Sequence, residues 1–177
     1  MKNKQIYLYV DGYNIINAWP NLYKLSNDID LDSAREQLID YMKEYQNLSG
    51  VDVYVVFDAY LVKGGMSIEE KRDNLTVVYT KEHESADRYI ERKVNDMKKH
   101  DKMYVASNDG MIQRIILSRG GIRISANELW KNYLTLKENL KRQKIKKRKT
   151  STDNIVTIDD EIYEKLEKLQ NKLKKQN

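Results

Sequence analysis

Short apolar runs alternate with longer amphipathic segments along most of the chain, and this alternation predicts an α/β fold. Runs rich in Val, Ile, Leu and Tyr are typical of strands, and they lie at 5–10, 51–57, 75–79, 103–106 and 122–124. Apolar residues recur at helical spacing through 31–48, 84–99 and 109–117. Strands that alternate with helices favour a mostly parallel sheet covered on both faces, whose ligands bind beyond the carboxyl ends of the strands.

Two further signals concern the second half of the chain. Ser125, followed three residues later by Glu128, is the pattern of a capping box and predicts that another helix begins there. Beyond residue 140 the chain changes character, because KRQKIKKRK at 141–149 holds seven basic residues in nine. A last amphipathic helix is predicted from the apolar stripe of Ile158, Ile162, Leu166, Leu169 and Leu173. We therefore predict a compact domain at 1–140 and a basic, helical extension at 141–177.

The net charge of +5 is concentrated in that extension. Residues 141–177 hold 12 Lys/Arg and 6 Asp/Glu, whereas the first 140 residues hold 20 Lys/Arg and 21 Asp/Glu. A near-neutral domain with a basic arm favours an anionic partner such as RNA, which the arm would bind. The alternative is that a lysine-rich tail only aids solubility.

Composition narrows the class of protein. The chain has no cysteine, which excludes disulfides and thiolate metal sites. The N-terminus lacks the apolar stretch of a signal peptide, and no apolar run approaches the roughly 20 residues that span a bilayer. These features predict a cytoplasmic protein without a membrane partner.

An acidic residue follows three of the predicted strands. Asp11 ends the first, Asp58 follows the second, and Asp109 lies in the Ser-Asn-Asp sequence after the fourth. A single Asp at such a position commonly caps a turn or a helix. Three that converge on one sheet edge would repel one another, and a hard cation such as Mg²⁺ or Mn²⁺ would offset that repulsion.

The predicted helix at 84–99 adds further acids. Glu84, Asp87 and Glu91 lie at i, i+3 and i+7, on one stripe beside the apolar face. We assign Asp87 to the site, whereas Glu84 fits a solvated helix start equally well. Four carboxylates without cysteine or clustered histidine favour metal-assisted phosphodiester hydrolysis, with catalytic and metal-binding roles for Asp11, Asp58, Asp87 and Asp109.

Five stretches together resemble the YacP-like branch of the NYN nucleases, which are relatives of PIN-domain nucleases. The resemblance runs in consistent order from about residue 5 to residue 140, and DGYN, ESAD and SND are fairly specific jointly. The stretches are VDGYNIINAWP, VYVVFDAY, TKEHESADRYIE, VASNDG and ILSRGGIRISANEL.

This resemblance implies a three-layer PIN-like α/β/α fold and endoribonuclease activity with Mg²⁺ or Mn²⁺. It also implies cleavage of bacterial mRNA in association with the ribosome. Asp11, Asp87 and Asp109 would form the acidic core together with Asp58. Asn14 would orient the loop of Asp11 or touch a phosphate. The sequence Asn-Asp-Gly departs from the expected Ser-Asp followed by a larger residue, and this leaves open whether Asn108 or Asp109 is the main site residue of that loop.

Other candidates for substrate contact have simpler alternatives. Tyr13 follows a strand end and could stack on an unpaired base or cover the core. Arg114 could meet a phosphate or be an ordinary exposed arginine, and we group Glu84, Glu91 and Asn108 with it as substrate-binding candidates. Neither Gly64-Gly65 nor Gly120-Gly121 belongs to a GxGxxG or P-loop pattern, which predicts no nucleotide cofactor and disfavours a small-molecule phosphotransferase.

The main competing hypothesis is a non-catalytic RNA- or ribosome-binding module with the same fold. The retained acids argue against it, because a protein that only binds anions gains nothing from clustered carboxylates.

Overall fold

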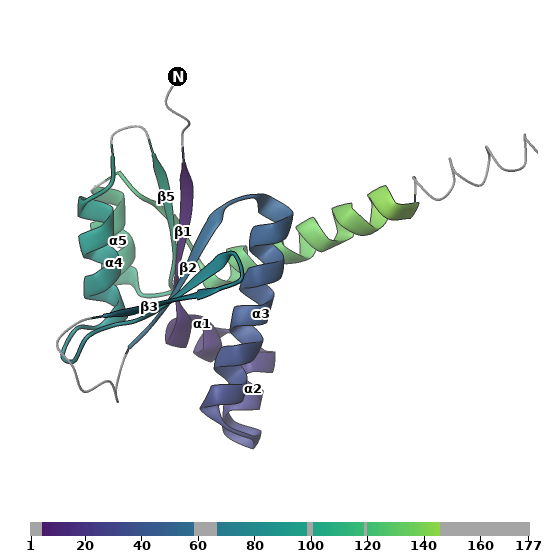
Figure 1. Cartoon of the computed structure of the whole chain (residues 1–177), viewed down its shortest axis with the longest axis horizontal. Helices are drawn as coiled ribbons and strands as arrows, with labels where there is room; N and C mark the ends of the chain where they lie inside the picture. Colours follow the sequence, from purple (N-terminus) through teal and green to yellow (C-terminus); the bar gives the residue numbers. More distant parts are fainter. Residues whose placement is uncertain (1–4, 59–66, 99–100, 119, 146–177) are drawn as a thin grey trace, which may run out of the picture. The chain divides into compact units, whose positions relative to one another are not determined.

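A six-stranded sheet forms the centre of the computed structural model, which describes residues 5–58, 67–98, 101–118 and 120–145. The strand order is β3-β4-β2-β1-β5-β6 (Figure 1). Neighbours are parallel except β3 and β4, which pair antiparallel, so the predicted mostly parallel sheet is confirmed. The strands are β1 (Ile6–Asp11), β2 (Asp52–Phe57), β3 (Ile68–Arg72), β4 (Leu75–Tyr79), β5 (Lys102–Ala106) and β6 (Ile122–Ile124).

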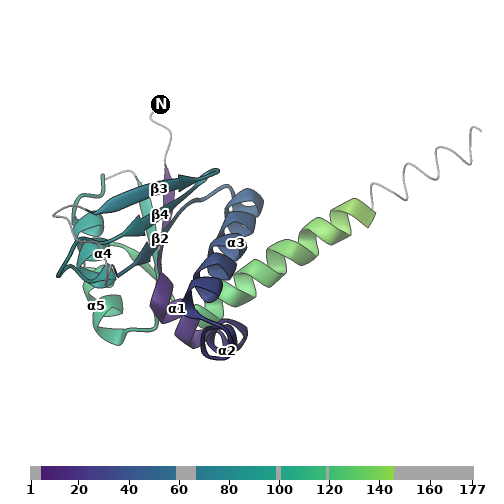
Figure 2. The ribbon, with the colours of Figure 1, turned by 60° about the horizontal axis from the view of Figure 1, so that its bottom comes forward.

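Helices cover both faces of the sheet, which confirms the three-layer α/β/α architecture (Figure 2). Side chains alternate along each strand, so that Leu8 and Val10 join one buried cluster while Tyr9 joins the other. The first cluster packs against α1 to α3 and the start of a helix at 126–145, and the second packs against α4 and α5. The helices are α1 (Gly12–Ala18), α2 (Pro20–Asp28), α3 (Leu31–Ser49), α4 (Ala86–Asn95) and α5 (Gly110–Ser118).

The start of α4 differs from the sequence prediction. The helix begins at Ala86 because the hydroxyl of Ser85 caps it and accepts the backbone N–H of Arg88 at 3.3 Å. Glu84 therefore lies outside the helix, and the predicted stripe of three acids is wrong. Only Asp87 and Glu91 lie on α4, at i and i+4. The helix also ends at Asn95, earlier than predicted.

Two buried side chains, Trp19 and Gln46, make hydrogen bonds that connect helices to other parts of the fold. The indole N–H of Trp19 donates to the carbonyl of Ala126 at 2.9 Å, which ties α1 and α2 to the helix at 126–145. The amide of Gln46 accepts the N–H of Val53 and donates to the carbonyl of Asn74, both at 2.7 Å. These contacts satisfy buried backbone groups and position β2 against α3.

The predicted capping box is confirmed at the start of the 126–145 helix. The N–H of Ser125 donates to the Glu128 carboxylate at 2.7 Å, and the N–H of Glu128 donates to the Ser125 hydroxyl at 3.2 Å. Contacts divide the chain into one unit that ends at Leu136 and a second that begins at Lys137. The predicted last helix and residues 146–149 of the basic run lie outside the described residues, and the 1–140 domain boundary stays a prediction. Within the described part of the chain, no helix has the length and apolarity to cross a membrane.

Gly12, directly after Asp11, is where α1 packs most tightly on the sheet. A Cβ at this position would lie 2.2 Å from the ring of Phe57, which is fully buried and has no room to move away. We expect Gly12→Ala to lower the free energy of unfolding by about 1–3 kcal/mol in urea denaturation, as overpacking does. Gly110→Ala is the control, because a Cβ there meets nothing within 4 Å. Equal stability of the two variants would contradict this packing.

Candidate active site

Asp11 lies at the end of β1, where it also caps α1. One carboxylate oxygen accepts the backbone N–H of Asn14 at 3.2 Å, and the other accepts the hydroxyl of Ser107 at 3.5 Å. Only 9% of the residue is exposed. The capping role and a site role are thus compatible, because capping uses one oxygen and turns the second toward the end of β5.

The loop after β5 presents the second acidic position. The Ser107 hydroxyl, which donates to Asp11, also accepts the N–H of Asp109 at 3.1 Å. The amide of Gln113 donates to the carbonyl of Ser107 at 2.6 Å and holds the loop against α5. Ser107 is therefore the link between Asp11 and Asp109, and our sequence-based site did not include it. Its position at the strand end, next to two polar residues, was the available signal.

Two predicted substrate contacts instead build this loop. The side-chain oxygen of Asn14 accepts the N–H of Asn108 at 2.7 Å, and the side-chain oxygen of Asn108 accepts the N–H of Ala126 at 2.9 Å. Asn14 thus orients the loop of residues 107–109, and Asn108 connects this loop to the start of the helix at 126–145. The side-chain oxygen of Asn108 is used in this contact. Asp109 is therefore the residue of this loop whose side chain can offer an oxygen to a metal ion.

Asp58 and Asp87 bring the other two acids to the same edge of the sheet. The Asp58 carboxylate accepts the backbone N–H of Ala86 and so holds the start of α4 close to the end of β2. This places Asp87, the next residue of α4, close enough to Asp11 for the two carboxyl groups to affect each other's pKa. Asp11, Asp58, Asp87 and Asp109 thus come from four segments of the chain and lie near one another. The Asp58 carboxylate is used mainly in its contact with the start of α4.

The electrostatics reflect this crowding. Burial, together with the negative charges of Asp87 and Asp58, raises the pKa of Asp11 to about 7 despite the hydrogen bond from Asn14. Burial also raises the pKa of Asp87, and the charges of Asp109 and Asp58 act in the same direction. Neighbouring buried carboxylates are costly to ionise together, and a bound cation would offset that cost.

A cleft of about 220 Å³ opens beside these acids, between α4 and α5. Its polar lining comes from the first turns of α4 and the loop before α5, and its apolar floor comes from α5. The lining residues are Ser85, Asp87, Arg88, Glu91 and Asp109, above Ile115 and Ile116. Glu91, one turn beyond Asp87 on α4, also lines this cleft, and its role in binding substrate stays a prediction.

Three remaining candidates lie apart from this cleft. The carboxylate of Glu84, only 9% exposed, pairs with Arg92 at 2.8 Å, which gives it a structural contact at the edge of α4. The ring of Tyr13 packs 5.2 Å from that of Phe57 and has the guanidinium of Arg35 above it, so it covers the core. Arg114 donates to the carbonyl of Gly110 within its own helix.

The donor set suits a hard divalent cation. Carboxylate oxygens are the ligands that Mg²⁺ and Mn²⁺ prefer, and burial together with neighbouring carboxylates raises the pKa of both Asp11 and Asp87. No three acidic or histidine side chains of the described residues already converge on a single point as a ligand set would. The oxygens of Asp11 accept from Asn14 and Ser107, and the Asp58 carboxylate accepts the N–H of Ala86, so these oxygens face protein donors.

Comparison with known proteins decides the family. The model of the YacP-like NYN domain matches residues 8–171. The chain belongs to the YacP-like NYN domain family. The YacP protein of Bacillus subtilis is 37% identical over 164 residues, which cover 91% of this chain and 94% of the relative.

Solved structures give the same result. The crystal structure of Rae1 (YacP) from Bacillus subtilis has a TM-score of 0.67 at 34% identity and covers 93% of this chain and 94% of its own. A mutant of Rae1 has a TM-score of 0.68 at 35% identity and covers 80% of this chain and 84% of its own. The resemblance inferred from the sequence is thus confirmed, and nuclease activity is the general function that membership of this family implies.

Proposed function

We propose that this member of the YacP-like NYN family is a metal-dependent endoribonuclease that hydrolyses phosphodiester bonds of RNA in the cytoplasm. The observation that carries the proposal is that two partly buried acids, Asp11 at the end of β1 and Asp87 on α4, lie close together beside the carboxyl ends of the strands. Crowding two buried acids together costs free energy, and a protein that merely binds RNA gains nothing from it. The same pair is useful where a divalent cation must be held.

Asp11, Asp87 and Asp109 would hold Mg²⁺ or Mn²⁺, with Asp58 contributing mainly through its position at the start of α4. The cation, when bound, would activate a water and stabilise the leaving oxygen. The Ser107 hydroxyl links Asp11 to the backbone of Asp109, because it donates one hydrogen bond and accepts the other. Asn14 fixes the backbone of the same loop, which limits the movement of Asp109. The described residues thus supply rigid support for carboxylates that need a defined separation.

The substrate within this class is mRNA associated with the ribosome, an inference that rests on resemblance to the family and on charge. The first 140 residues hold slightly more acidic than basic residues, so they attract free RNA weakly. The basic run at 141–149 would anchor the chain on a large RNA surface and raise the effective concentration of the site near its target.

The test compares one mRNA, free and in translating complexes at equal concentration, with Mn²⁺ or with EDTA. We expect cleavage only with the metal and a higher initial rate on ribosomes. Equal rates on free and ribosome-bound mRNA would leave a general single-strand ribonuclease. Binding without cleavage under every condition would favour the alternative, a non-catalytic RNA- or ribosome-binding module.

A further inference from the structure

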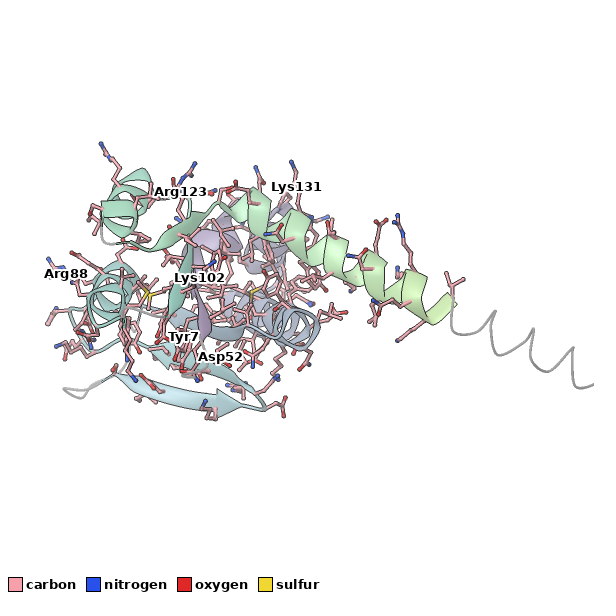
Figure 3. All side chains as sticks on the ribbon, turned by 90° about the horizontal axis from the view of Figure 1, so that it is seen from above. Tyr7, Asp52, Arg88, Lys102, Arg123 and Lys131 are labelled. Atoms are coloured by element: carbon pink, nitrogen blue, oxygen red, sulfur yellow. The ribbon has the colours of Figure 1, made fainter. Side chains whose placement is uncertain are left out.

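Among the described residues that line the cleft beside the acids, one side chain is cationic. Three of the lining side chains, Asp87, Glu91 and Asp109, are carboxylates, and the cation among them is Arg88 on the first turn of α4. Figure 3 shows the Arg88 side chain extending outward from its helix. Arg88 is exposed, so its guanidinium can reach a ligand that enters the cleft from solvent.

Arg88 also lacks the contacts that the other described arginines make. Six of them use the guanidinium within the protein, pairing with a carboxylate or donating to a carbonyl or amide oxygen: Arg35, Arg72, Arg92, Arg114, Arg123 and Arg142. In the part of the chain that the structure describes, the guanidinium of Arg88 makes no such contact, although Glu91 lies at i+3. Five donors in a planar fork are thus left for a ligand.

The position of Arg88 is unfavourable for the helix itself. It is the third residue of α4, in the first turn, where the partial positive charge of the helix N-terminus repels a cation. Its backbone N–H is already used by the cap, because it donates to the Ser85 hydroxyl. Helix stability therefore gives no reason for an arginine here, and a role toward a ligand does.

We propose that Arg88 binds a phosphate of the RNA strand in this cleft, next to the phosphodiester that the acids would cleave. This deepens the proposed function and rests on it for the identity of the strand. A phosphate that approaches three carboxylates needs a local cation, and a guanidinium can bind it through two parallel hydrogen bonds. Ile115 and Ile116 provide an apolar surface on the opposite wall, against which a sugar or base can pack.

The test measures binding separately from cleavage. A fluorescein-labelled single-stranded oligoribonucleotide is titrated with the full chain carrying Asp11→Asn, in EDTA, so that the RNA stays intact. Adding Arg88→Ala should weaken binding roughly tenfold, the effect of losing one charge-assisted contact. It should also reduce the slope of log K against log salt by about 0.7, the value for one phosphate contact with a single strand. Arg88→Lys should keep the slope but lose part of the affinity, because it keeps the charge and not the fork.

Lys102→Ala is the matched control. Lys102, labelled in Figure 3, is an exposed cation at the start of β5, whereas the acids lie beyond the carboxyl ends of the strands. The proposal is overturned if Arg88→Ala leaves affinity and salt slope unchanged, or if Lys102→Ala changes both as much. Failure of the nuclease proposal would appear differently: the parent chain would not cleave RNA with Mn²⁺, while Arg88→Ala would still weaken binding.

Discussion

Replacing Asp11 with Asn should lower the rate of RNA cleavage at least ~100-fold, because losing one carboxylate ligand forfeits several kcal/mol of transition-state stabilisation. The substitution is nearly isosteric, and asparagine caps a helix as well as aspartate does, so the contact with the N–H of Asn14 can be kept. Asp52→Asn is the control, since this exposed carboxylate lies at the start of β2, away from the site. Cleavage by the Asp11 variant at the parent rate would exclude Asp11 as a ligand.

The free energy of unfolding of Asp11→Asn, measured as a function of pH, distinguishes a loss of catalysis from a loss of folding. The pKa of Asp11 is raised from 3.8 to about 7 in the folded chain, so the folded state keeps a proton that the unfolded chain releases. The free energy of unfolding of the metal-free parent should therefore fall as pH rises from about 4 to about 7, by up to roughly 4 kcal/mol. Asp11→Asn should remove most of this fall and be more stable than the parent at pH 8. A parent whose stability is flat across this range would contradict the buried, charge-crowded site.

The second large effect concerns the basic run at 141–149. The part of it that the structure describes, 141–145, is helical and exposed. Substituting Gln for its seven Lys and Arg residues should reduce RNA affinity by roughly 100-fold at about 0.15 M salt. Each contact with a single strand contributes about 0.7 to the salt slope, so the slope should fall by about 3 if most of the run binds phosphate.

Five lysines further along provide the control for this prediction. Lys165, Lys168, Lys172, Lys174 and Lys175 lie in the same extension, and the first two are interspersed with glutamates. Neutralising them should change the salt slope much less. An unchanged slope after neutralisation of 141–149 would mean that the run only aids solubility.

Most of the sheet could be predicted because β1, β2, β4 and β5 are apolar and buried, so hydrophobic pattern alone marks them. β3 could not, because IEEKR contains one apolar residue and its strand conformation comes from pairing with β4 across a short turn. α1 was missed for a related reason. Its seven residues are too few to display a helical period, and the cap from Asp11 together with packing on Phe57 stabilises it.

The acids at the strand ends followed from a general rule of parallel sheets, and the structure places Asp11 and Asp87 close together. Other parts of the site depend on contacts between residues distant in the chain. Asn14 and Asn108 are 94 positions apart, and nothing in either segment reveals that one orients the other. The misplacement of Glu84 came from the helix boundary, which depends on a capping serine whose role is visible only in three dimensions.

Calorimetric titration of the metal-free chain with Mn²⁺ tests the metal-dependent nuclease most directly. We predict saturable binding that is lost in Asp11→Asn and in Asp87→Asn and retained in Asp52→Asn. No saturable binding by the parent chain, or binding that the Asp11 and Asp87 variants retain, would contradict a metal site at the ends of these strands.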